Sequence, residues 1–266
     1  MSNLALKSTF NTAVELYHSR RPGYPPELFA KLIADTHLPK YAELLEIGPG
    51  TGQATRPFAE RGYHITAVEL GAELAAKARE LRAGYPNVDI ITSAFEDVKL
   101  SSERYDLVYS ATAFHWIKPE VKFTKPYQLL KPGGYLAIIH TEHVSDEAGD
   151  AFFHACKPLY QKYRDTDKPI NTRGDFKPPT LADLRPPETI DEALFSLESF
   201  TVFPMTISYT SQEYIDLLAT YSPQLAMPET KRRAFLAGIK ALIDKDFGGR
   251  MTKHYGMTLT IARKRQ

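Results

Sequence analysis

The chain has 266 residues, and its 33 Lys and Arg nearly balance its 32 Asp and Glu, so the formal net charge is +1 at pH 7. Hydrophobic residues make up 43% and charged residues 24% of the sequence, proportions that exclude intrinsically disordered, collagen-like and coiled-coil chains. The near-neutral charge, without a long run of like charges, argues against nucleic acid or an anionic membrane as a partner.

The N-terminal stretch from Asn11 to Ile33 is aromatic and basic, and prolines interrupt it at positions 22, 25 and 26. This pattern predicts a short helix, an irregular turn and a second helix that starts at Pro25 or Pro26, since proline suits the first helical position. We expect the stretch to act as a brace or lid across a sheet.

From Ala42 onward, apolar β-prone runs alternate with helical patterns. Strands are predicted at 42–47, 64–69, 88–92, 105–110 and 134–140, and helices at 53–61, 73–83 and 118–130. The turn K-P-G-G, residues 131–134, is predicted to end the last of these helices before the fifth strand. Successive βα units of this kind predict a Rossmann-like, doubly wound, mainly parallel α/β sheet.

The sequence changes character beyond Thr141. It predicts a helix at 148–163, a long polar loop at 168–188, an extended edge strand at 194–209, helices at 211–220 and 229–246, and a last strand at 253–262. We therefore expect a single domain in four parts: a brace (1–40), a ligand-binding core (41–142), a substrate-covering insertion with an edge strand (143–250) and a final strand (251–266).

A glycine-rich turn follows the first strand as E-I-G-P-G-T-G, with Glu46 before Gly48, Gly50 and Gly52. Such a turn points backbone N–H groups and a helix N-terminus at the carboxyl edge of the sheet, where open α/β folds bind ligands. A dinucleotide fingerprint needs glycine where Gln53 stands, and no Gly-Lys-Ser/Thr of a P-loop follows. An acid at position 46 disfavours a pyrophosphate and suits a ligand that carries an ammonium group.

The second strand ends in Glu69, about 20 residues after the first glycine, where an acid in such folds binds ribose hydroxyls. The ligand is therefore expected to contain ribose and to lack a pyrophosphate. Alternative interpretations are an ordinary tight turn for the glycines and a helix cap for the acid.

Five ordered motifs, E-I-G-P-G-T-G, A-V-E-L, A-F-E-D, Y-D-L-V-Y-S-A and L-K-P-G-G, span roughly residues 41–140. Together they resemble the class I S-adenosylmethionine-dependent methyltransferases, which have a seven-stranded fold. The early R-P-G-Y-P and the later F-H-W-I resemble the small-molecule branch of that family, which includes trans-aconitate-type methyltransferases.

The resemblance implies a set of residues that bind S-adenosylmethionine. The three glycines would contact its methionyl part with Glu46 near the ammonium, Glu69 would bind the ribose, and the remaining members of the set are Gln53, Leu70, Ala94, Phe95, Ser110 and Ala111. Leu70, Ala94 and Phe95 are expected around the adenine, and Ser110 and Ala111 on the methionyl side. Many relatives carry an adenine-binding Asp where this chain has Ser93-Ala94.

The residues that bind or activate the methyl acceptor are less marked in the sequence. His115 is the candidate base, and the candidate substrate-binding residues are Tyr17, Arg21, Trp116, His140 and Tyr209. An arginine fork suits a substrate carboxylate, although Arg20 and Arg21 are also consistent with a solvated lid. Trp116 is also consistent with core packing, His140 with a structural role at a strand end, and the tyrosines at 209, 214 and 221 with packing.

The single cysteine, Cys156, excludes an intramolecular disulfide and any multi-cysteine metal site, and a buried structural thiol is its simplest interpretation. The first twelve residues lack the apolar segment of a signal peptide, and no window approaches the roughly 18 apolar residues of a membrane span. We expect a cytoplasmic monomer or homodimer.

The predicted reaction moves a methyl group from S-adenosylmethionine to an O, N or C atom of a small-molecule acceptor by in-line displacement. Methyl transfer depends mainly on placing the acceptor atom, and a carboxylate acceptor needs no base. The alternatives are a non-catalytic cofactor-binding module and a nicotinamide-dependent oxidoreductase. The N/D-P-P-Y/W motif of enzymes that methylate nucleic-acid amino groups is replaced here by S-A-T-A-F-H-W.

Overall fold

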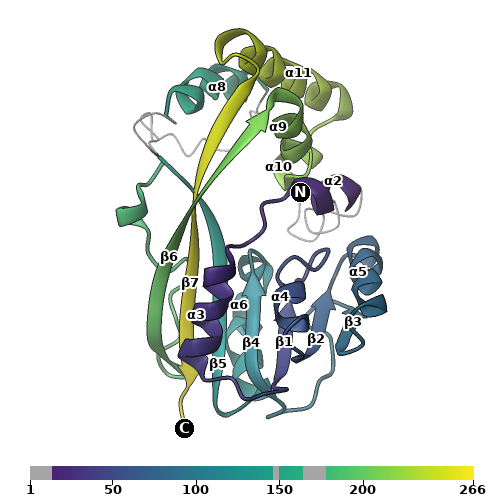
Figure 1. Cartoon of the computed structure of the whole chain (residues 1–266), viewed down its shortest axis with the longest axis vertical. Helices are drawn as coiled ribbons and strands as arrows, with labels where there is room; N and C mark the ends of the chain where they lie inside the picture. The colour runs from purple at the N-terminus through teal and green to yellow at the C-terminus, as the bar shows by residue number, and fades with distance from the viewer. Residues whose placement is uncertain (1–13, 146–149, 164–177) are drawn as a thin grey trace.

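A computed structural model describes residues 14–145, 150–163 and 178–266. Within these ranges one sheet contains seven strands: β1 (Glu43–Ile47), β2 (His64–Glu69), β3 (Val88–Thr92), β4 (Tyr105–Ala111), β5 (Leu130–Val144), β6 (Phe195–Thr210) and β7 (Arg250–Lys264). Their order is β3-β2-β1-β4-β5-β7-β6 (Figure 1). The strands β1 to β5 pair in parallel, whereas β7 runs antiparallel to both β5 and β6. The predicted doubly wound, mainly parallel, seven-stranded sheet is confirmed.

Helices surround the sheet and extend beyond it. They are α2 (Val14–Arg20), α3 (Pro26–Thr36), α4 (Thr55–Ala59), α5 (Ala72–Arg79), α6 (Pro119–Lys122), α7 (Thr124–Leu129), α8 (Asp150–Tyr163), α9 (Ser211–Leu218), α10 (Ser222–Leu225) and α11 (Glu229–Asp246), with short 3-10 turns at Glu80–Ala83, Phe114–Trp116 and Leu181–Asp183. The helix α3 begins with Pro26 at its first position, as predicted.

Both faces of the sheet are buried, which explains the continuous apolar runs of its central strands. Successive side chains of a strand point to opposite faces, so Leu44 of β1 joins the cluster that contains Phe29 of α3 and Phe58 of α4. Its neighbour Leu45 joins the cluster on the other face, which contains Leu129 of α7. This layering leaves the carboxyl edge of the parallel strands as the place for a ligand.

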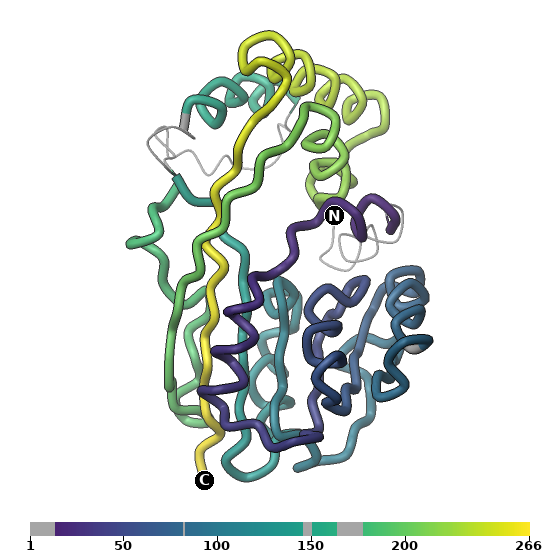
Figure 2. The backbone as a smooth tube through the Cα atoms, in the orientation of Figure 1, coloured from purple at the N-terminus to yellow at the C-terminus, as the bar shows by residue number. Residues whose placement is uncertain are grey.

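Four helices, α8, α9, α10 and α11, form a cap over that edge. The helix α11 packs against α8 and α9, and the cap sits at the end of two long strands, β6 and β7, which run from the sheet into it (Figures 1 and 2). The edge strand predicted at 194–209 is confirmed as β6, and the last strand is confirmed as β7, between β5 and β6.

Two predicted boundaries are wrong. The turn at 131–134 does not precede the fifth strand but lies inside β5, where the pairing with β4 jumps from Tyr105↔Leu130 to Leu107↔Tyr135 and leaves a bulge. The strand also continues to Val144 instead of ending at His140. The bulge accommodates Gly133 at φ +74°, a conformation that glycine adopts without strain.

The helix predicted at 118–130 is two helices, α6 and α7. Pro126 explains the break, because its nitrogen carries no hydrogen and cannot donate to the carbonyl four residues earlier. The predicted helix at 148–163 is confirmed from Asp150 onward, and the predicted loop at 168–188 is described only from residue 178, where it includes one 3-10 turn. Among the described helices, none combines the length and the apolar character that crossing a membrane requires.

Candidate active site

The glycine-rich loop joins β1 to α4, and all three of its predicted glycines have positive φ: +71° at Gly48, +61° at Gly50 and +93° at Gly52. Side chains here are excluded by space as well as by conformation. A Cβ at Gly48 would lie 2.5 Å from Ala113 Cβ, and one at Gly52 would lie 2.3 Å from Leu81 Cδ1. Glycine is therefore favoured at these positions because of neighbouring residues of the protein itself, which hold the backbone in one conformation.

Glu69, at the end of β2, connects this loop to α5. One carboxylate oxygen accepts a hydrogen bond from Gly50 N (3.0 Å) and the other from Gly71 N (2.8 Å). Burial raises the pKa of Glu69, while the backbone N–H groups of Gly71, Gly50 and Leu70 lower it. A carboxylate has about four acceptor sites, so each oxygen keeps capacity for a further donor such as a ribose hydroxyl.

A first cavity opens beside Glu69 at the carboxyl ends of β1, β2 and β4. Its empty space amounts to about 710 Å³ when the open mouth is included. Its walls combine the glycine loop, an apolar slot and one buried acid, and they consist of Tyr17, Ile47, Gly48, Gly50, Val68, Glu69, Leu70, Leu74, Ser93, Ala94, Phe95, Glu96, Ala111, Thr112, Ala113, Trp116 and Ile117.

A second cavity, of about 650 Å³ counting its mouth, lies on the other side of the loop. It shares Tyr17, Gly48, Ala111 and Thr112 with the first cavity. The remainder of its wall is more polar and consists of Arg21, Pro22, Tyr24, Glu46, Pro49, Gln53, Ala54, Thr141, His143 and Tyr221.

Four side chains of the second cavity carry buried polar atoms that have no hydrogen-bond partner among the described residues. These atoms are Arg21 Nε, Glu46 Oε1, Gln53 Nε2 and His143 Nδ1. Native proteins rarely leave buried polar atoms unpaired, and here four of them line one cavity. Such a concentration is typical of a site that awaits a polar ligand.

Thr112 stands where the two cavities meet, and its backbone has φ +57°. A β-branched residue in this conformation is strained. Its hydroxyl forms hydrogen bonds with Tyr24 (3.0 Å) and Thr141 (3.3 Å), both in the wall of the second cavity. Local strain of this kind is concentrated at functional sites.

Glu46 is fully buried at the end of β1. Its Oε2 accepts hydrogen bonds from the hydroxyls of Thr55 (2.6 Å) and Tyr109 (2.9 Å). Burial raises the pKa of Glu46 to about 7, with the Glu69 charge adding to the increase and the two hydroxyls opposing it. Burial thus favours the neutral form of this carboxyl group more than in an exposed glutamate.

Arg21 enters the second cavity between two aromatic rings. Its guanidinium carbon lies 5.0 Å from the ring centroid of Tyr17 and 4.3 Å from that of Tyr221, distances typical of cation–π contacts. Its Nη2 donates to the carbonyl of Thr220 (3.0 Å). The two rings fix the plane of the guanidinium. The N–H groups along its edge are then the ones that can bind an anion.

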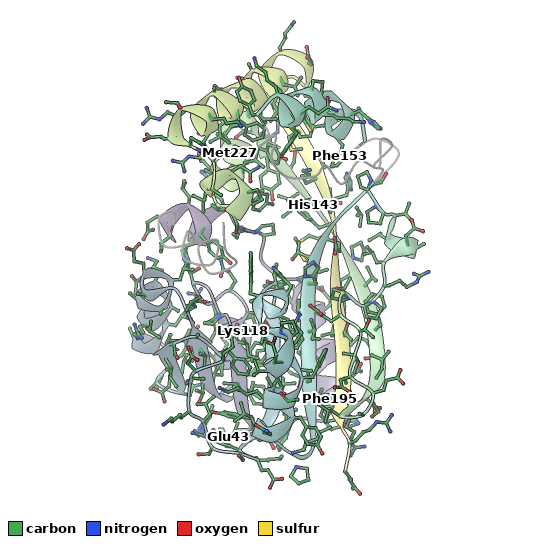
Figure 3. The ribbon with its side chains drawn as sticks, turned by 180° about the vertical axis from the view of Figure 1, so that it is seen from behind. Glu43, Lys118, His143, Phe153, Phe195 and Met227 are labelled. Atoms are coloured by element: carbon green, nitrogen blue, oxygen red, sulfur yellow. The ribbon has the colours of Figure 1, made fainter. Side chains whose placement is uncertain are left out.

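His143 lies near the end of β5, between the sheet and the cap (Figure 3). Its ring centroid is 4.9 Å from that of Tyr255. Burial and the positive charges of Lys253 and Arg21 lower the pKa of His143 to about 4, against an opposing contribution from Glu142. The imidazole is therefore neutral at pH 7.

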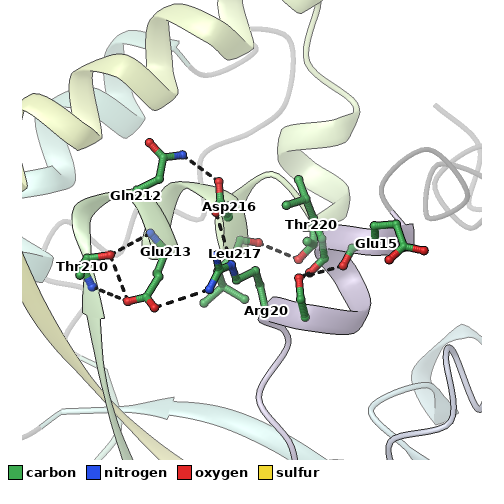
Figure 4. A network of polar contacts seen from close by, with 10 residues as sticks. Glu15, Arg20, Thr210, Gln212, Glu213, Asp216, Leu217 and Thr220 are labelled. Carbon is green, nitrogen blue, oxygen red and sulfur yellow. Dashed lines mark hydrogen bonds and ion pairs between the residues drawn. The ribbon is translucent and has the colours of Figure 1, made fainter.

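The helix α2 contacts both the cap and the glycine loop. On the cap side, Arg20 forms ion pairs with Glu213 (3.5 Å) and Asp216 (3.3 Å) of α9 (Figure 4). On the loop side, His18 forms a hydrogen bond with Thr51 Oγ1 (3.0 Å), and the Tyr17 ring lies 3.1 Å from the place a Cβ of Gly50 would occupy. The helix thus closes one side of the space between cap and core.

The residues predicted to bind the cofactor divide between the cavities. Gly48, Gly50, Glu69, Leu70, Ala94, Phe95 and Ala111 line the first cavity, with Gly48 and Ala111 also in the second, whereas Glu46 and Gln53 line only the second. Gly52 and Ser110 line neither. Ser110 is buried and its hydroxyl donates to the carbonyl of Ile47 (2.8 Å), which ties β4 to β1.

The residues predicted for the acceptor are more dispersed. Tyr17 lines both cavities, Arg21 the second and Trp116 the first. Tyr209 is buried beside Tyr255, with 3.2 Å between their hydroxyl oxygens, and lines neither cavity.

His115 and His140 also lie outside both cavity walls. Their ring centroids are 5.8 Å apart, and His140 Nε2 lies 3.2 Å from Glu142 Oε1. Residues 140 and 142 alternate with 141 and 143 along β5, so they face the opposite side of the strand from the second cavity. The described residues contain no group of three or more His, Cys, Asp or Glu arranged to hold a metal ion.

Among the polar residues that line the second cavity, Tyr24, Thr112, Thr141 and His143 were not predicted from the sequence. The last two follow from the period-2 alternation of β5 once that strand is extended past His140. Tyr24 belongs to the R-P-G-Y-P motif, which was recognised, but nothing in the sequence indicates that it contacts Thr112.

Comparison with known proteins identifies the fold. Residues 45–138 match a family model described as a methyltransferase domain. The chain is 33% identical over 132 residues to an uncharacterized methyltransferase of Schizosaccharomyces pombe, covering 49% of this chain and 51% of that protein. It is also 33% identical over 102 residues to malonyl-[acyl-carrier protein] O-methyltransferase of Enterobacter lignolyticus, covering 37% and 39% of the two chains.

Among solved structures, a candidate type II methyltransferase of Anaeromyxobacter dehalogenans superposes with a TM-score of 0.62 and 22% identity, covering 92% of this chain and 97% of that one. The chain spans about half the length of the first of these curated relatives. The family match, the seven-stranded topology and the glycine loop agree with one another. The segment 45–138 therefore matches a methyltransferase domain, and the fold of the chain is shared with methyltransferases of known structure.

Proposed function

We propose that the chain transfers a methyl group from S-adenosylmethionine, bound in the first cavity, to a small-molecule acceptor bound in the second. The observation that carries this proposal is the wall that the cavities share: Tyr17, Gly48, Ala111 and Thr112 line both. Methyl transfer requires the acceptor atom and the methyl carbon to approach within about 3–3.5 Å in line. Two adjoining cavities, one with an acid suited to ribose and one polar, support this proposal because they would hold the two reactants side by side.

The first cavity suits the cofactor in its chemistry as well as its size. The Glu69 carboxylate, held by Gly50 N and Gly71 N, has acceptor capacity left for both ribose hydroxyls. Leu70, Phe95 and Ile117 supply apolar surface for the adenine. The bound cofactor would supply a methyl group that its sulfonium already activates. The protein therefore has to bind and orient the cofactor and the acceptor, and to exclude water.

The second cavity suits an acceptor that carries a carboxylate. Arg21 offers a guanidinium whose plane is fixed by Tyr17 and Tyr221, and a planar fork of donors matches a carboxylate. The Gln53 amide, with its unpaired nitrogen, adds a second donor on the same wall. We assign no role in binding the acceptor to His115, His140 or Tyr209, because they lie outside both cavities.

The finer attributes of the enzyme belong to the same proposal. A cytoplasmic location is supported by the use of a single cysteine, buried as Cys156, and a small-molecule partner by the size and polarity of the second cavity. A nicotinamide dinucleotide is disfavoured, because the third glycine of its fingerprint is replaced by Gln53. Neither a nucleic acid nor a membrane is proposed as a partner. We propose that the protein is a monomer or a homodimer.

Calorimetric titration with S-adenosylhomocysteine tests the cofactor site. We expect the wild-type protein to bind it and Glu69→Gln to bind it about 10- to 150-fold more weakly, the equivalent of 1.5–3 kcal/mol for hydrogen bonds to a charged group. Glu60→Gln, which changes an exposed acid at the end of α4 that lines neither cavity, is the matched control and should bind like wild type. Failure of the wild-type protein to bind would contradict the proposed function.

A further inference from the structure

His143 belongs to the part of the second cavity that lies toward the cap, away from the glycine loop (Figure 3). The strand β4 lies between β1 and β5, so β5 runs about 10 Å from the strand that leads into the loop. Along β5, Thr141 contacts Thr112 where the two cavities meet, and the Cα atom of His143 lies two residues, about 7 Å, beyond that of Thr141. The imidazole therefore borders the space assigned to the acceptor and not the loop assigned to the cofactor.

Aromatic neighbours hold the imidazole of His143 in place. Its ring centroid lies 4.9 Å from that of Tyr255 and 6.4 Å from that of Tyr221. Tyr255 is itself buried, and its hydroxyl oxygen lies 3.2 Å from that of Tyr209. The Nδ1 atom of His143 is buried and has no hydrogen-bond partner within the described part of the chain. A buried polar atom on a fixed ring in a cavity wall is available to a ligand.

The charges around His143 restrict the group that can bind there. Lys253 of β7 and Arg21, which follows α2, are positive and lower the pKa of the imidazole together with burial, whereas Glu142 on the same strand raises it. A neutral imidazole nitrogen either donates or accepts one hydrogen bond, according to the tautomer. A hydroxyl group matches both tautomers, because it can accept and donate. An ammonium group is disfavoured by the two neighbouring cations.

We propose that the acceptor is a hydroxycarboxylic acid, whose hydroxyl forms a hydrogen bond with His143 Nδ1 while its carboxylate lies at Arg21. This inference rests on the proposed function and deepens it by naming the class of acceptor. Because His143 lies beyond Thr141, the hydroxyl that it binds is a recognition group, and the atom that receives the methyl group lies nearer to Thr112. His143 thus determines specificity and is not a base, since a base works best with a pKa near the working pH.

Matched acceptors test the assignment. Hydroxycarboxylic acids of several chain lengths, each paired with the analogue that lacks the hydroxyl and with the analogue that carries an amine instead, are incubated with methyl-labelled S-adenosylmethionine. Wild type should use a hydroxy acid with kcat/KM at least about tenfold above both analogues, with the label on an atom other than the recognised hydroxyl. Methylation of no hydroxy acid, equal use of an analogue, or label on that hydroxyl would overturn the inference.

Variants of His143 show whether this residue causes the preference. His143→Phe keeps a ring against Tyr255 but cannot form the hydrogen bond, so its preference for the hydroxy acid over the analogue without hydroxyl should fall to within about threefold. Its kcat/KM for that analogue should stay near the wild-type value, which a general structural defect would not allow. His143→Asn, which places a polar atom close to the position of Nδ1, should retain part of the preference.

His254→Phe is the matched control. His254 pairs with Val144 in the register beside His143↔Tyr255, forms a hydrogen bond with Thr206 and lines neither cavity. This variant should keep the wild-type preference, and thermal unfolding verifies that every variant is folded. An unchanged preference in His143→Phe, or an equal loss in His254→Phe, would overturn the assignment.

The imidazole also provides a readout that does not depend on turnover. In protein with isotopically labelled histidine, saturated with S-adenosylhomocysteine, the nuclear magnetic resonance signals of His143 are those absent from His143→Phe. The Nδ1 signal should move when the preferred hydroxy acid is added and stay in place when its analogue without hydroxyl is added. A signal that responds to both or to neither would contradict the inference. Absence of S-adenosylhomocysteine binding to wild type would instead overturn the proposed function.

Discussion

Two buried carboxylates, Glu46 and Glu69, end neighbouring strands of the sheet, yet their environments differ. Backbone N–H groups engage both oxygens of Glu69, whereas Glu46 has two hydroxyls at one oxygen and no protein donor among the described residues at the other. A buried charge without a compensating partner is costly. Burial raises the pKa of both carboxyls, but hydrogen-bond donors stabilise the charged form at both oxygens of Glu69 and at only one oxygen of Glu46.

The pH dependence of stability should reflect this difference. The pKa of Glu46 is raised from 4.5 to about 7 by folding, so its contribution to stability is fully present below the lower value and is lost as pH rises through the higher one. At 1.36 kcal/mol per pKa unit the loss is about 3 kcal/mol. Glu46→Gln lacks this titration, so urea unfolding should find it more stable than wild type at pH 8, with a gap that shrinks at pH 5. A gap of equal size at both pH values would contradict this.

The glycine loop allows conformational and steric costs to be separated. Gly48 and Gly248 have similar φ values, +71° and +61°, but a Cβ would clash with Ala113 at the first and meet nothing within 4 Å at the second. Gly248→Ala should cost about 1–2 kcal/mol of unfolding free energy, and Gly48→Ala about 2–5 kcal/mol because overpacking adds to it. Adding Ala113→Gly to Gly48→Ala should recover the steric part. Equal costs for the two single variants would show that packing at the loop is unimportant.

At this scale the sequence predicts which residues cluster but not which side of the loop they face. The glycines, Glu69, Leu70 and Phe95 all lie at the expected edge because strand ends and turn chemistry place them there. Glu46 and Gln53 belong to the same loop, yet they line the other cavity, since a motif records order along the chain and not the direction of each side chain.

At the scale of elements, α2 connects parts of the molecule that are far apart in sequence. Arg20 reaches α9, and Tyr17 and His18 reach the glycine loop. None of the residues of α2 is buried, so the helix depends on these polar and aromatic contacts and not on an apolar core. Elements with little burial open locally at low free energy.

Hydrogen exchange should detect the contribution of the Arg20 ion pairs. Partly exposed pairs are worth about 0.2–1 kcal/mol, so Arg20→Ala should speed the exchange of α2 amides by up to roughly fivefold and leave β4 amides unchanged. Arg233→Ala, which removes an exposed pair within α11, is the control and should leave α2 unaffected. Faster exchange throughout the sheet in Arg20→Ala would mean that α2 is integral to the core.

Element boundaries depart from the prediction where two local preferences compete. Lys131 to Gly134 has the composition of a turn, but pairing with β4 continues on both sides of it and turns it into a bulge. The strand β5 runs past His140 because β7 pairs with it as far as Val144↔His254, a long-range partner that no local window contains. The edge strand β6 was predicted well, since its alternation is local.

At the scale of the whole molecule, segments that are distant in sequence build the cap and the sheet together. The segment from 143 to 250 supplies the cap, but its strand β6 belongs to the same sheet as the core, and β7 from the final segment lies between β5 and β6. The sheet order follows from pairing between distant segments, which sequence patterns alone do not encode. The cap and the core are thus built by interleaved stretches of chain.

The length of β6 and β7 bears on how such enzymes can be re-engineered. The strand β6 passes directly into α9, whereas three residues, Phe247 to Gly249, join α11 to β7, and the register of the two strands extends from Phe195↔Lys264 to Thr210↔Arg250. The pairing ends at Thr210↔Arg250, directly before α9 begins at Ser211, so a foreign cap has to continue from both strands at one register position. A chimeric protein has to join the two sequences within the paired strands, at positions that face each other in the register. The protein that receives the cap then keeps its sheet edge, and the protein that donates it supplies the whole surface that faces the acceptor.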